Sequence, residues 1–116
     1  MSAARSPLTT HVLDTSTGRP ARGIEVRLEL REASGFRELA QAVTDDDGRV
    51  AGLLAPGTLR VAVYRLRFAT ADYFATDGRA CFYPEVSIEF EITRPDEHHH
   101  VPLLLSPFGY STYRGS

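Results

Sequence analysis

The sequence predicts an all-β fold, an antiparallel β-sandwich with one short helix, and three observations carry this prediction. Two segments alternate strictly between apolar and polar residues, which is the period of a strand with one buried face. Turn signals containing Gly and Pro separate short segments along the chain. Only one segment carries helix signals, so a sandwich is favoured over a parallel α/β sheet. A length of 116 residues fits one domain over residues 1–116.

The clearest strand covers residues 24–31, in which apolar residues occupy the even positions and charged residues the odd ones. Residues 86–92 repeat this pattern, again with apolar residues at even positions. Between residues 59 and 68, the apolar residues change from odd to even positions. We expect a β-bulge or a twist near Tyr64 to explain the change.

The predicted helix covers residues 70–77, a length of about two turns. Thr70 is its expected N-cap, Asp72 lies in the first turn, and Gly78 stands just past the end.

The C-terminal segment, residues 101–116, remains apolar and aromatic almost to its last residue, whereas chain ends usually fray. This much apolar surface predicts a final strand packed in the core. The same segment is expected to form a subunit interface, because strands at a sheet edge can pair with another chain.

Charge and composition exclude several classes of partner. The 13 Lys and Arg nearly balance the 15 Asp and Glu, which argues against binding to nucleic acid or to an anionic membrane. No apolar run approaches the roughly 18 residues of a membrane helix, and residues 1–7 do not resemble a secretory signal. Cys81 is the only cysteine, so no intramolecular disulfide can form. We expect a cytoplasmic protein in which Cys81 is a small buried hydrophobe rather than a nucleophile.

Three consecutive histidines, His98, His99 and His100, are candidates for chemistry. In a strand, His98 and His100 share one face and His99 points to the other. A short His tract can bind zinc. A structural zinc site, however, needs about four ligands, and one face of this strand offers only two histidines. Spacing alone therefore favours three solvated residues after a turn.

Spacing alone does not assign His11 or Arg49 to catalysis either. His11 lies in the strand-like segment 8–14, where it shares a face with Thr9 and Leu13, and a lone histidine there is usually structural. Arg49 follows an Asp-Asp-Asp-Gly turn, where an arginine is ordinarily a surface charge.

Four motifs together resemble one enzyme family. The terminal sequence SPFGYSTYRGS of residues 106–116 closely resembles the terminal signature of the 5-hydroxyisourate hydrolases, the transthyretin-related enzymes. Residues 8–14, with the Gly-Arg-Pro of residues 18–20, resemble the first strand of that family. The Asp-Gly-Arg of residues 47–49 matches the position of the family's active-site arginine. Residues 98–104 match a strand that commonly reads His-Tyr-His-Val-Pro-Leu-Leu, so His99 stands where the family commonly has Tyr.

The resemblance implies a transthyretin-like fold of two four-stranded sheets, and a homotetramer, a dimer of dimers, with active sites between the dimers. It implies hydrolysis of the ring amide of 5-hydroxyisourate to 2-oxo-4-hydroxy-4-carboxy-5-ureidoimidazoline in urate degradation, with neither a metal ion nor an organic cofactor. The implied catalytic residues are His11, Arg49, His100 and Ser116, and the tail residues Tyr113, Arg114 and Gly115 complete the substrate-binding set.

Such a hydrolysis needs an activated water, stabilisation of the carbonyl oxyanion, and a proton for the departing nitrogen. A neutral imidazole with a pKa of about 6.5 can take the water proton, so His11 or His100 is the expected base. Arg49 suits the developing oxyanion. The terminal carboxylate of Ser116 is expected to orient Arg49 or a histidine. Ser116 is not expected to be a nucleophile, because no Ser-His-Asp triad is apparent.

Two rival functions remain at this point. A transthyretin-like carrier would bind a small aromatic ligand in the same cleft without turnover. A lining of His and Arg favours a polar, oxygen-rich ligand, whereas an apolar hormone favours a more apolar channel. A β-sandwich adhesion module would show no catalytic dependence on His or Arg. The polar residues therefore favour the hydrolase.

Overall fold

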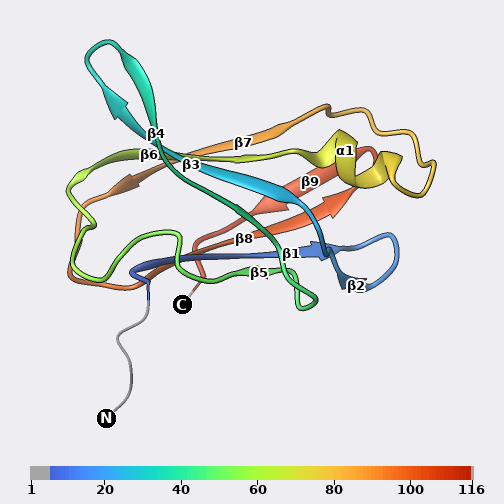
Figure 1. Ribbon diagram of the computed structural model, residues 1–116, viewed down its shortest axis with the longest axis horizontal. Helices are drawn as coiled ribbons and strands as arrows, with labels where there is room; N and C mark the ends of the chain where they lie inside the picture. Colours follow the sequence, from blue (N-terminus) through green and yellow to red (C-terminus); the bar gives the residue numbers. More distant parts are fainter. Residues whose placement is uncertain (1–5, 116) are drawn as a thin grey trace.

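The computed structural model describes residues 6–115 as two β-sheets packed face to face, with one short helix at one end (Figure 1). The elements, in chain order, are β1 (Leu8–Asp14), β2 (Arg19–Pro20), β3 (Glu25–Glu32), β4 (Gly35–Val43), β5 (Arg49–Val50), β6 (Ala62–Phe68), α1 (Thr70–Ala75), β7 (Val86–Ile92), β8 (His99–Ser106) and β9 (Gly109–Thr112). The predicted sandwich with a short helix is thus confirmed.

The sheet topology differs from the expectation in two details. One sheet has the order β4-β3-β6-β7; the other has the order β2-β1-β8-β9, and β5 also pairs with β1, which makes it five-stranded. The short strands β2 and β5 share one edge of β1, because β8 occupies the other. The second difference is that β1 and β8 run parallel rather than antiparallel. Alternation in a sequence fixes which face of a strand is buried, but not the direction of its neighbour.

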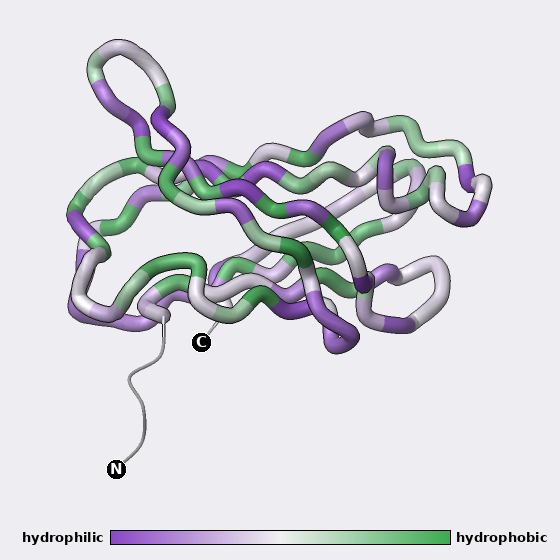
Figure 2. Tube along the Cα trace, in the orientation of Figure 1, coloured by the Kyte–Doolittle hydropathy of each residue, from purple (hydrophilic) through white to green (hydrophobic). Residues whose placement is uncertain are grey.

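The core lies between the sheets and follows the alternation of the sequence. Figure 2 shows apolar and polar residues alternating along the strands. In β3, the side chains of Val26, Leu28 and Leu30 are buried, as the pattern over residues 24–31 predicts. Burial of such apolar side chains contributes about 1.5–3 kcal/mol each, which is the main term that stabilises a sandwich.

The bulge expected near Tyr64 is absent from the pairing of β6, which keeps a continuous register with both β3 and β7. Tyr64 is itself a core residue, and its ring stacks on Phe90 with centroids 6.1 Å apart. The change from odd to even apolar positions in the sequence does not mark a bulge. Val61 precedes the strand, and its side chain is 67% exposed and not part of the core. The register shift lies instead between Leu28 and Glu29, where β3 pairs with β4.

The helix begins one residue earlier than its predicted cap suggests. Ala69 is the N-cap and makes no side-chain cap hydrogen bond, whereas Thr70 is the first helical residue. The Thr70 hydroxyl is committed elsewhere, because it donates to the Tyr83 carbonyl at 2.9 Å. The helix ends at Ala75, shorter than predicted, and Gly78 beyond it has a φ of 74°, which favours glycine. Within residues 6–115, no helix is long and apolar enough to cross a membrane.

The C-terminal segment forms a hairpin, β8 and β9, rather than one final strand. Leu103 and Leu105 of β8 are buried in the core, which confirms that the segment is packed. Tyr113 is 58% exposed, so the end of the segment is not core. Cys81 is partly buried, and its thiol donates to the Tyr83 carbonyl, as suits a packed residue.

A buried carboxylate connects β1 to the helix end of the sandwich. The Asp14 side chain is fully buried and accepts hydrogen bonds from the Tyr73 hydroxyl at 2.8 Å and from Arg79 Nη2 at 3.0 Å. Burial raises the pKa of Asp14, but hydrogen bonds from Ser16, Tyr73 and Arg79 outweigh burial and lower it. Asp14 is therefore ionised in the fold and paired with Arg79.

We expect Asp14→Ala to lower the free energy of unfolding by about 3–5 kcal/mol, because it leaves Arg79 without its buried partner. Denaturant unfolding measures the change. Asp77→Ala is the matched control: Asp77 also pairs with Arg79 but is 57% exposed, so its removal should cost less than about 1 kcal/mol. Equal losses in the two variants would contradict the role given to Asp14.

Candidate active site

Three strands bring the predicted residues onto one face of a sheet. Thr9 and His11 lie two residues apart on β1, on the face opposite its buried side chains. In the antiparallel β1–β5 pair, Arg49 stands opposite His11. In the parallel β1–β8 pair, His100 stands opposite Thr9. His11, Arg49 and His100, predicted from motifs far apart in the sequence, therefore share the outer face of this sheet.

The turn before β5 explains why Arg49 lies so close to β1. Asp45 Oδ1 accepts the backbone N–H of Arg49 at 3.0 Å, and the Gly48 N–H donates to the Asp45 carbonyl. Gly48 has a φ of 74°, and a Cβ atom there would clash with the backbone oxygen of Val12. Glycine at this position therefore lets the turn approach β1 and sets Arg49 opposite His11. The Arg49 side chain is exposed and accessible to a ligand.

The histidine tract is divided between two faces, as strand alternation predicts. On the outer face, His98 Nε2 and His100 Nδ1 both contact Thr9 Oγ1, at 3.0 and 2.9 Å. His99 is only 6% exposed, and its Nδ1 hydrogen-bonds to the Glu97 carbonyl at 2.9 Å. The interpretation from spacing alone, that all three are solvated, is wrong because the strand turns His99 inward.

His100 has an environment that favours its neutral form. Burial lowers the pKa of His100, and the positive charge of Arg49 lowers it further. His11 and His98 act in the same direction, while a hydrogen bond to the backbone of Thr9 opposes them. The net pKa lies below the ordinary imidazole value, so His100 is a neutral imidazole near pH 7.

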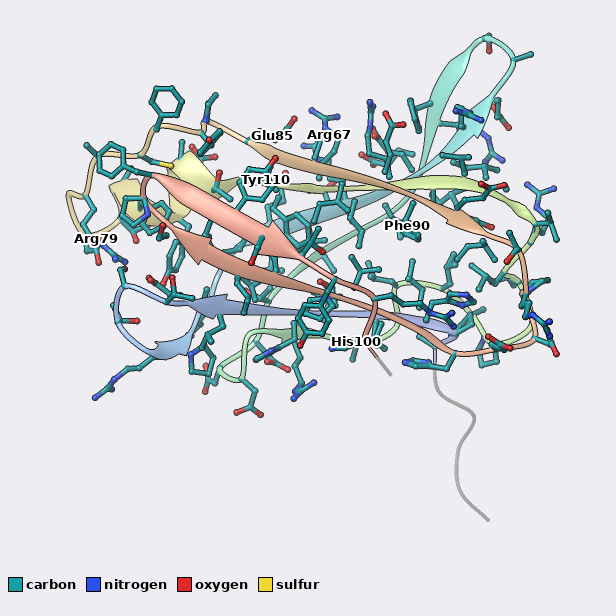
Figure 3. The ribbon with its side chains drawn as sticks, turned by 180° about the vertical axis from the view of Figure 1, so that it is seen from behind. Arg67, Arg79, Glu85, Phe90, His100 and Tyr110 are labelled. Atoms are coloured by element: carbon teal, nitrogen blue, oxygen red, sulfur yellow. The ribbon has the colours of Figure 1, made fainter. Side chains whose placement is uncertain are left out.

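Figure 3 shows His100 on the sheet that contains β8, while Arg67 and Glu85 lie on the other side of the sandwich. The ion pairs between Arg67 and two carboxylates, Glu85 and the nearly buried Glu29, belong to that opposite face. They tie β3, β6 and the start of β7 together, and they are not part of the candidate site.

The C-terminal tail returns to the site through its backbone. The Gly115 N–H donates to the His100 carbonyl at 2.8 Å. Arg114 points to a different partner, because its Nη2 donates to Glu97 Oε1 at 3.1 Å. Ser116, the fourth predicted catalytic residue, lies outside the described residues. The tail is thus placed beside His100 by Gly115.

Gly115 also packs directly on the His100 ring. A Cβ atom at Gly115 would lie 2.6 Å from His100 Cδ2, too close for both side chains to keep their places. We expect Gly115→Ala to displace the ring and lower kcat/KM about tenfold to a hundredfold, as steady-state kinetics would measure.

Gly109→Ala in the same hairpin is the matched control for this change. A Cβ atom at Gly109 meets only Ser106 Oγ, at 3.7 Å, which is an ordinary contact. Near-normal kcat/KM in both alanine variants would show that the contact of Gly115 with His100 has no functional role.

Sequence reasoning missed Thr9 and His98 as members of the cluster. Strand alternation puts Thr9 on the same face as His11, and His98 on the same face as His100, so the sequence pattern contains a signal for each residue. Only the parallel register of β1 with β8 brings Thr9 between the two histidines. A hollow of about 560 Å³ beside Thr9 offers room for a small molecule next to the cluster.

The described residues contain no group of three or more His, Cys, Asp or Glu side chains arranged to hold a metal ion. The donors that gather on the sheet are imidazoles, a hydroxyl and a guanidinium, and the guanidinium repels cations. Reaction without a metal ion stays a prediction that a chelator would test.

The transthyretin-like fold expected from the sequence is confirmed by solved structures that share it. Residues 8–115 match the model of the HIUase/Transthyretin family, and the chain belongs to this family.

The relatives and solved structures that resemble this chain include both 5-hydroxyisourate hydrolases and transthyretins. The chain is 48% identical over 118 residues to the 5-hydroxyisourate hydrolase of Mus musculus, covering 100% of both. The structure of Klebsiella pneumoniae 5-hydroxyisourate hydrolase has a TM-score of 0.81 at 39% identity, with 97% of this chain and 100% of that one covered. Sea bream transthyretin in complex with thyroxine has a TM-score of 0.89 at 30% identity, with 95% of each chain covered.

Proposed function

We propose that this chain hydrolyses a ring amide of 5-hydroxyisourate, giving 2-oxo-4-hydroxy-4-carboxy-5-ureidoimidazoline in urate degradation. The observation that carries the proposal is the placement of Arg49 opposite His11, with His100 on the adjoining strand. The curated relatives named 5-hydroxyisourate hydrolase, at 44–48% identity over nearly the whole chain, support the same activity.

In the proposed mechanism, His100 is the general base. Its lowered pKa keeps the ring neutral near pH 7, so it can take a proton from a water molecule. The water oxygen then bonds to the ring carbonyl carbon, and Arg49 stabilises the negative charge that develops on the carbonyl oxygen. The protonated His100 returns its proton to the departing nitrogen as the C–N bond breaks. His11, which lies opposite Arg49, is proposed to bind and orient the substrate.

The tail completes the proposed substrate site. Gly115 lies against His100, through its backbone hydrogen bond and its contact with the imidazole ring. The terminal carboxylate of Ser116 is proposed to orient Arg49 or a histidine, as carboxylates commonly do for catalytic groups. Tyr113 is exposed and available to the substrate. Arg114 is held by Glu97, so its proposed role requires that ion pair to open or to be shared.

The carrier alternative is less well supported. The structure of sea bream transthyretin, which resembles this chain, contains thyroxine. Binding of a small ligand without turnover is therefore the alternative to compare. This chain, however, gathers polar side chains on the outer face of one sheet, and these groups suit a polar substrate: Thr9, His11, Arg49, His98 and His100. The full-length hydrolase relatives favour turnover as well.

We also propose that the protein assembles as a homotetramer, a dimer of dimers, with the sites at the interface between dimers. Strands β7 and β9 are edge strands of the two sheets, and edges of this kind can pair with another chain. Phe82, Phe108 and Tyr110 are exposed aromatic residues near one end of these strands, as expected of a surface that another chain covers. Light scattering coupled to size exclusion measures the mass directly.

Residues 1–116 are proposed to act as one cytoplasmic hydrolase domain that needs no metal ion or organic cofactor. The single cysteine is compatible with a reducing compartment. Cell fractionation tests the location, and activity that survives a chelator tests the absence of a metal requirement.

The deciding experiment generates 5-hydroxyisourate from urate with urate oxidase and follows the decay of its near-ultraviolet absorbance. Decay that accelerates in proportion to the concentration of this protein supports the hydrolase. Decay at the spontaneous rate, in the presence of folded tetramer, contradicts it and turns attention to ligand binding without turnover.

A further inference from the structure

A single hydroxyl group joins two histidines of the site. Thr9 Oγ1 lies 2.9 Å from His100 Nδ1 and 3.0 Å from His98 Nε2. Thr9 is half-buried on the strand β1, which pairs with β5 on one side and with β8 on the other, and Thr9 itself lies opposite His100 of β8. Neither the family motifs nor the proposed mechanism gives Thr9 or His98 a role.

The direction of the Thr9 O–H bond decides which nitrogen of His100 carries a proton. A hydroxyl donates one hydrogen bond and accepts others through its lone pairs. If Thr9 donates to His98 Nε2, its lone pair accepts the Nδ1–H of His100, and His100 Nε2 keeps a lone pair. If Thr9 donates to His100 Nδ1, then Nε2 of the neutral ring carries the proton and cannot act as a base.

We propose that Thr9, with its proton directed to His98, is a positioning residue that holds His100 in the Nδ1–H form and leaves Nε2 as the base. This assignment rests on the proposed hydrolase function. His98 supports it by offering Nε2 as the acceptor for the Thr9 proton.

The proton balance of the reaction is consistent with this arrangement. His100 Nε2 takes a proton from water while the Nδ1–H bond to Thr9 stays in place, so the ring becomes an imidazolium with one charge. The Thr9 oxygen, polarised by its own donation to His98, then faces the positive ring with its lone pair. When Nε2 gives its proton to the departing nitrogen, His100 returns to the neutral Nδ1–H form without any change at Thr9 or His98.

Thr9→Val tests the proposal, because it removes the hydroxyl and keeps the shape of the side chain. We expect kcat to fall about tenfold to a hundredfold with KM little changed, since a positioned base loses its correct tautomer. Thr9→Ser restores the hydroxyl and should recover kcat to within about threefold. Nitrogen-15 shifts of the labelled imidazoles in the intact protein should show Nδ1–H at His100 in the wild type and in Thr9→Ser, and a mixture of tautomers in Thr9→Val.

Thr10→Val is the matched control. Thr10 is the next residue on β1, its hydroxyl donates to the Val101 carbonyl on the core side, and it touches none of the histidines. This change should lower the melting temperature and leave the His100 tautomer as in the wild type. His98→Phe supplies a second test, because the Thr9 hydroxyl loses its acceptor and can then either donate to His100 Nδ1 or accept from it, so the mixture of tautomers should appear again.

If Thr9→Val kept both its kcat and the Nδ1–H form of His100, the role assigned to Thr9 would be wrong. The proposed hydrolase function would still hold in that case, because the wild type is active. An inactive wild type would instead contradict the proposed function. The nitrogen-15 shifts need no turnover, so they decide the role of Thr9 in either case.

Discussion

Replacement of His100 by alanine is expected to lower kcat about a hundredfold to ten-thousandfold, because the reaction loses its general base. The wild-type enzyme should show a matching pH dependence. Since burial and then Arg49 lower the pKa of His100, the neutral base persists below the ordinary imidazole value of about 6.5. The rate, corrected for spontaneous decay, should therefore stay level near neutrality and fall with a midpoint below that value.

The free energy of unfolding should also depend on pH through the protonation of His100. A histidine whose pKa is lowered in the folded state contributes stability that is present above its unfolded pKa and is lost as the pH falls through its folded pKa. Denaturant unfolding of the wild type against His100→Ala over pH 7 to about pH 5 isolates this contribution. His99→Ala is a useful contrast, because His99 is buried on the inner face and should lower stability more than catalysis. A His100→Ala enzyme with near-normal turnover would remove His100 from the mechanism.

The second large effect is expected for Arg49→Ala, with kcat lower by about a hundredfold to a thousandfold through loss of oxyanion stabilisation. The fold of the chain should be unchanged, because the Arg49 side chain is exposed on the outer face of the sheet and forms no ion pair among the described residues. The same variant should raise the pKa of His100, since the positive charge of Arg49 is one cause of its lowered value. Histidine titration by NMR measures this shift without substrate.

Two further variants, Arg49→Lys and Arg22→Ala, show whether a loss of kcat comes from the charge of Arg49, from its planar donors, or from the loss of any arginine near this turn. Lysine keeps the charge but not the planar pair of donors, so it should restore the pKa of His100 and only part of kcat. Arg22 pairs with Asp46 near the same turn, and both side chains are largely exposed, so Arg22→Ala should leave kcat unchanged. If Arg49→Ala retained most of its turnover, oxyanion stabilisation by Arg49 would be wrong.

Local patterns were sufficient for most of the strands but failed where a side chain has a tertiary partner. The alternation over residues 24–31 and 86–92 is reproduced in β3 and β7 because each has one face in the core. The predicted bulge near Tyr64 is wrong, because the Tyr64 ring belongs to the core and the side chain of Val61 does not. Thr70 was wrong as an N-cap because its hydroxyl binds the Tyr83 carbonyl, a contact made across a loop.

The amino-acid sequence alone is enough to predict the class of fold, the family motifs, and the candidate residues His11, Arg49 and His100. It also determined that His98 and His100 share a face, because a strand has a period of two. The contact of Thr9 with both histidines, by contrast, becomes visible only once the strands are packed together. Residues 9 and 100 are 91 positions apart, and their contact depends on β1 and β8 being parallel neighbours in one register. Strand alternation holds no information about partner or direction, which are set when the two sheets pack and close the core.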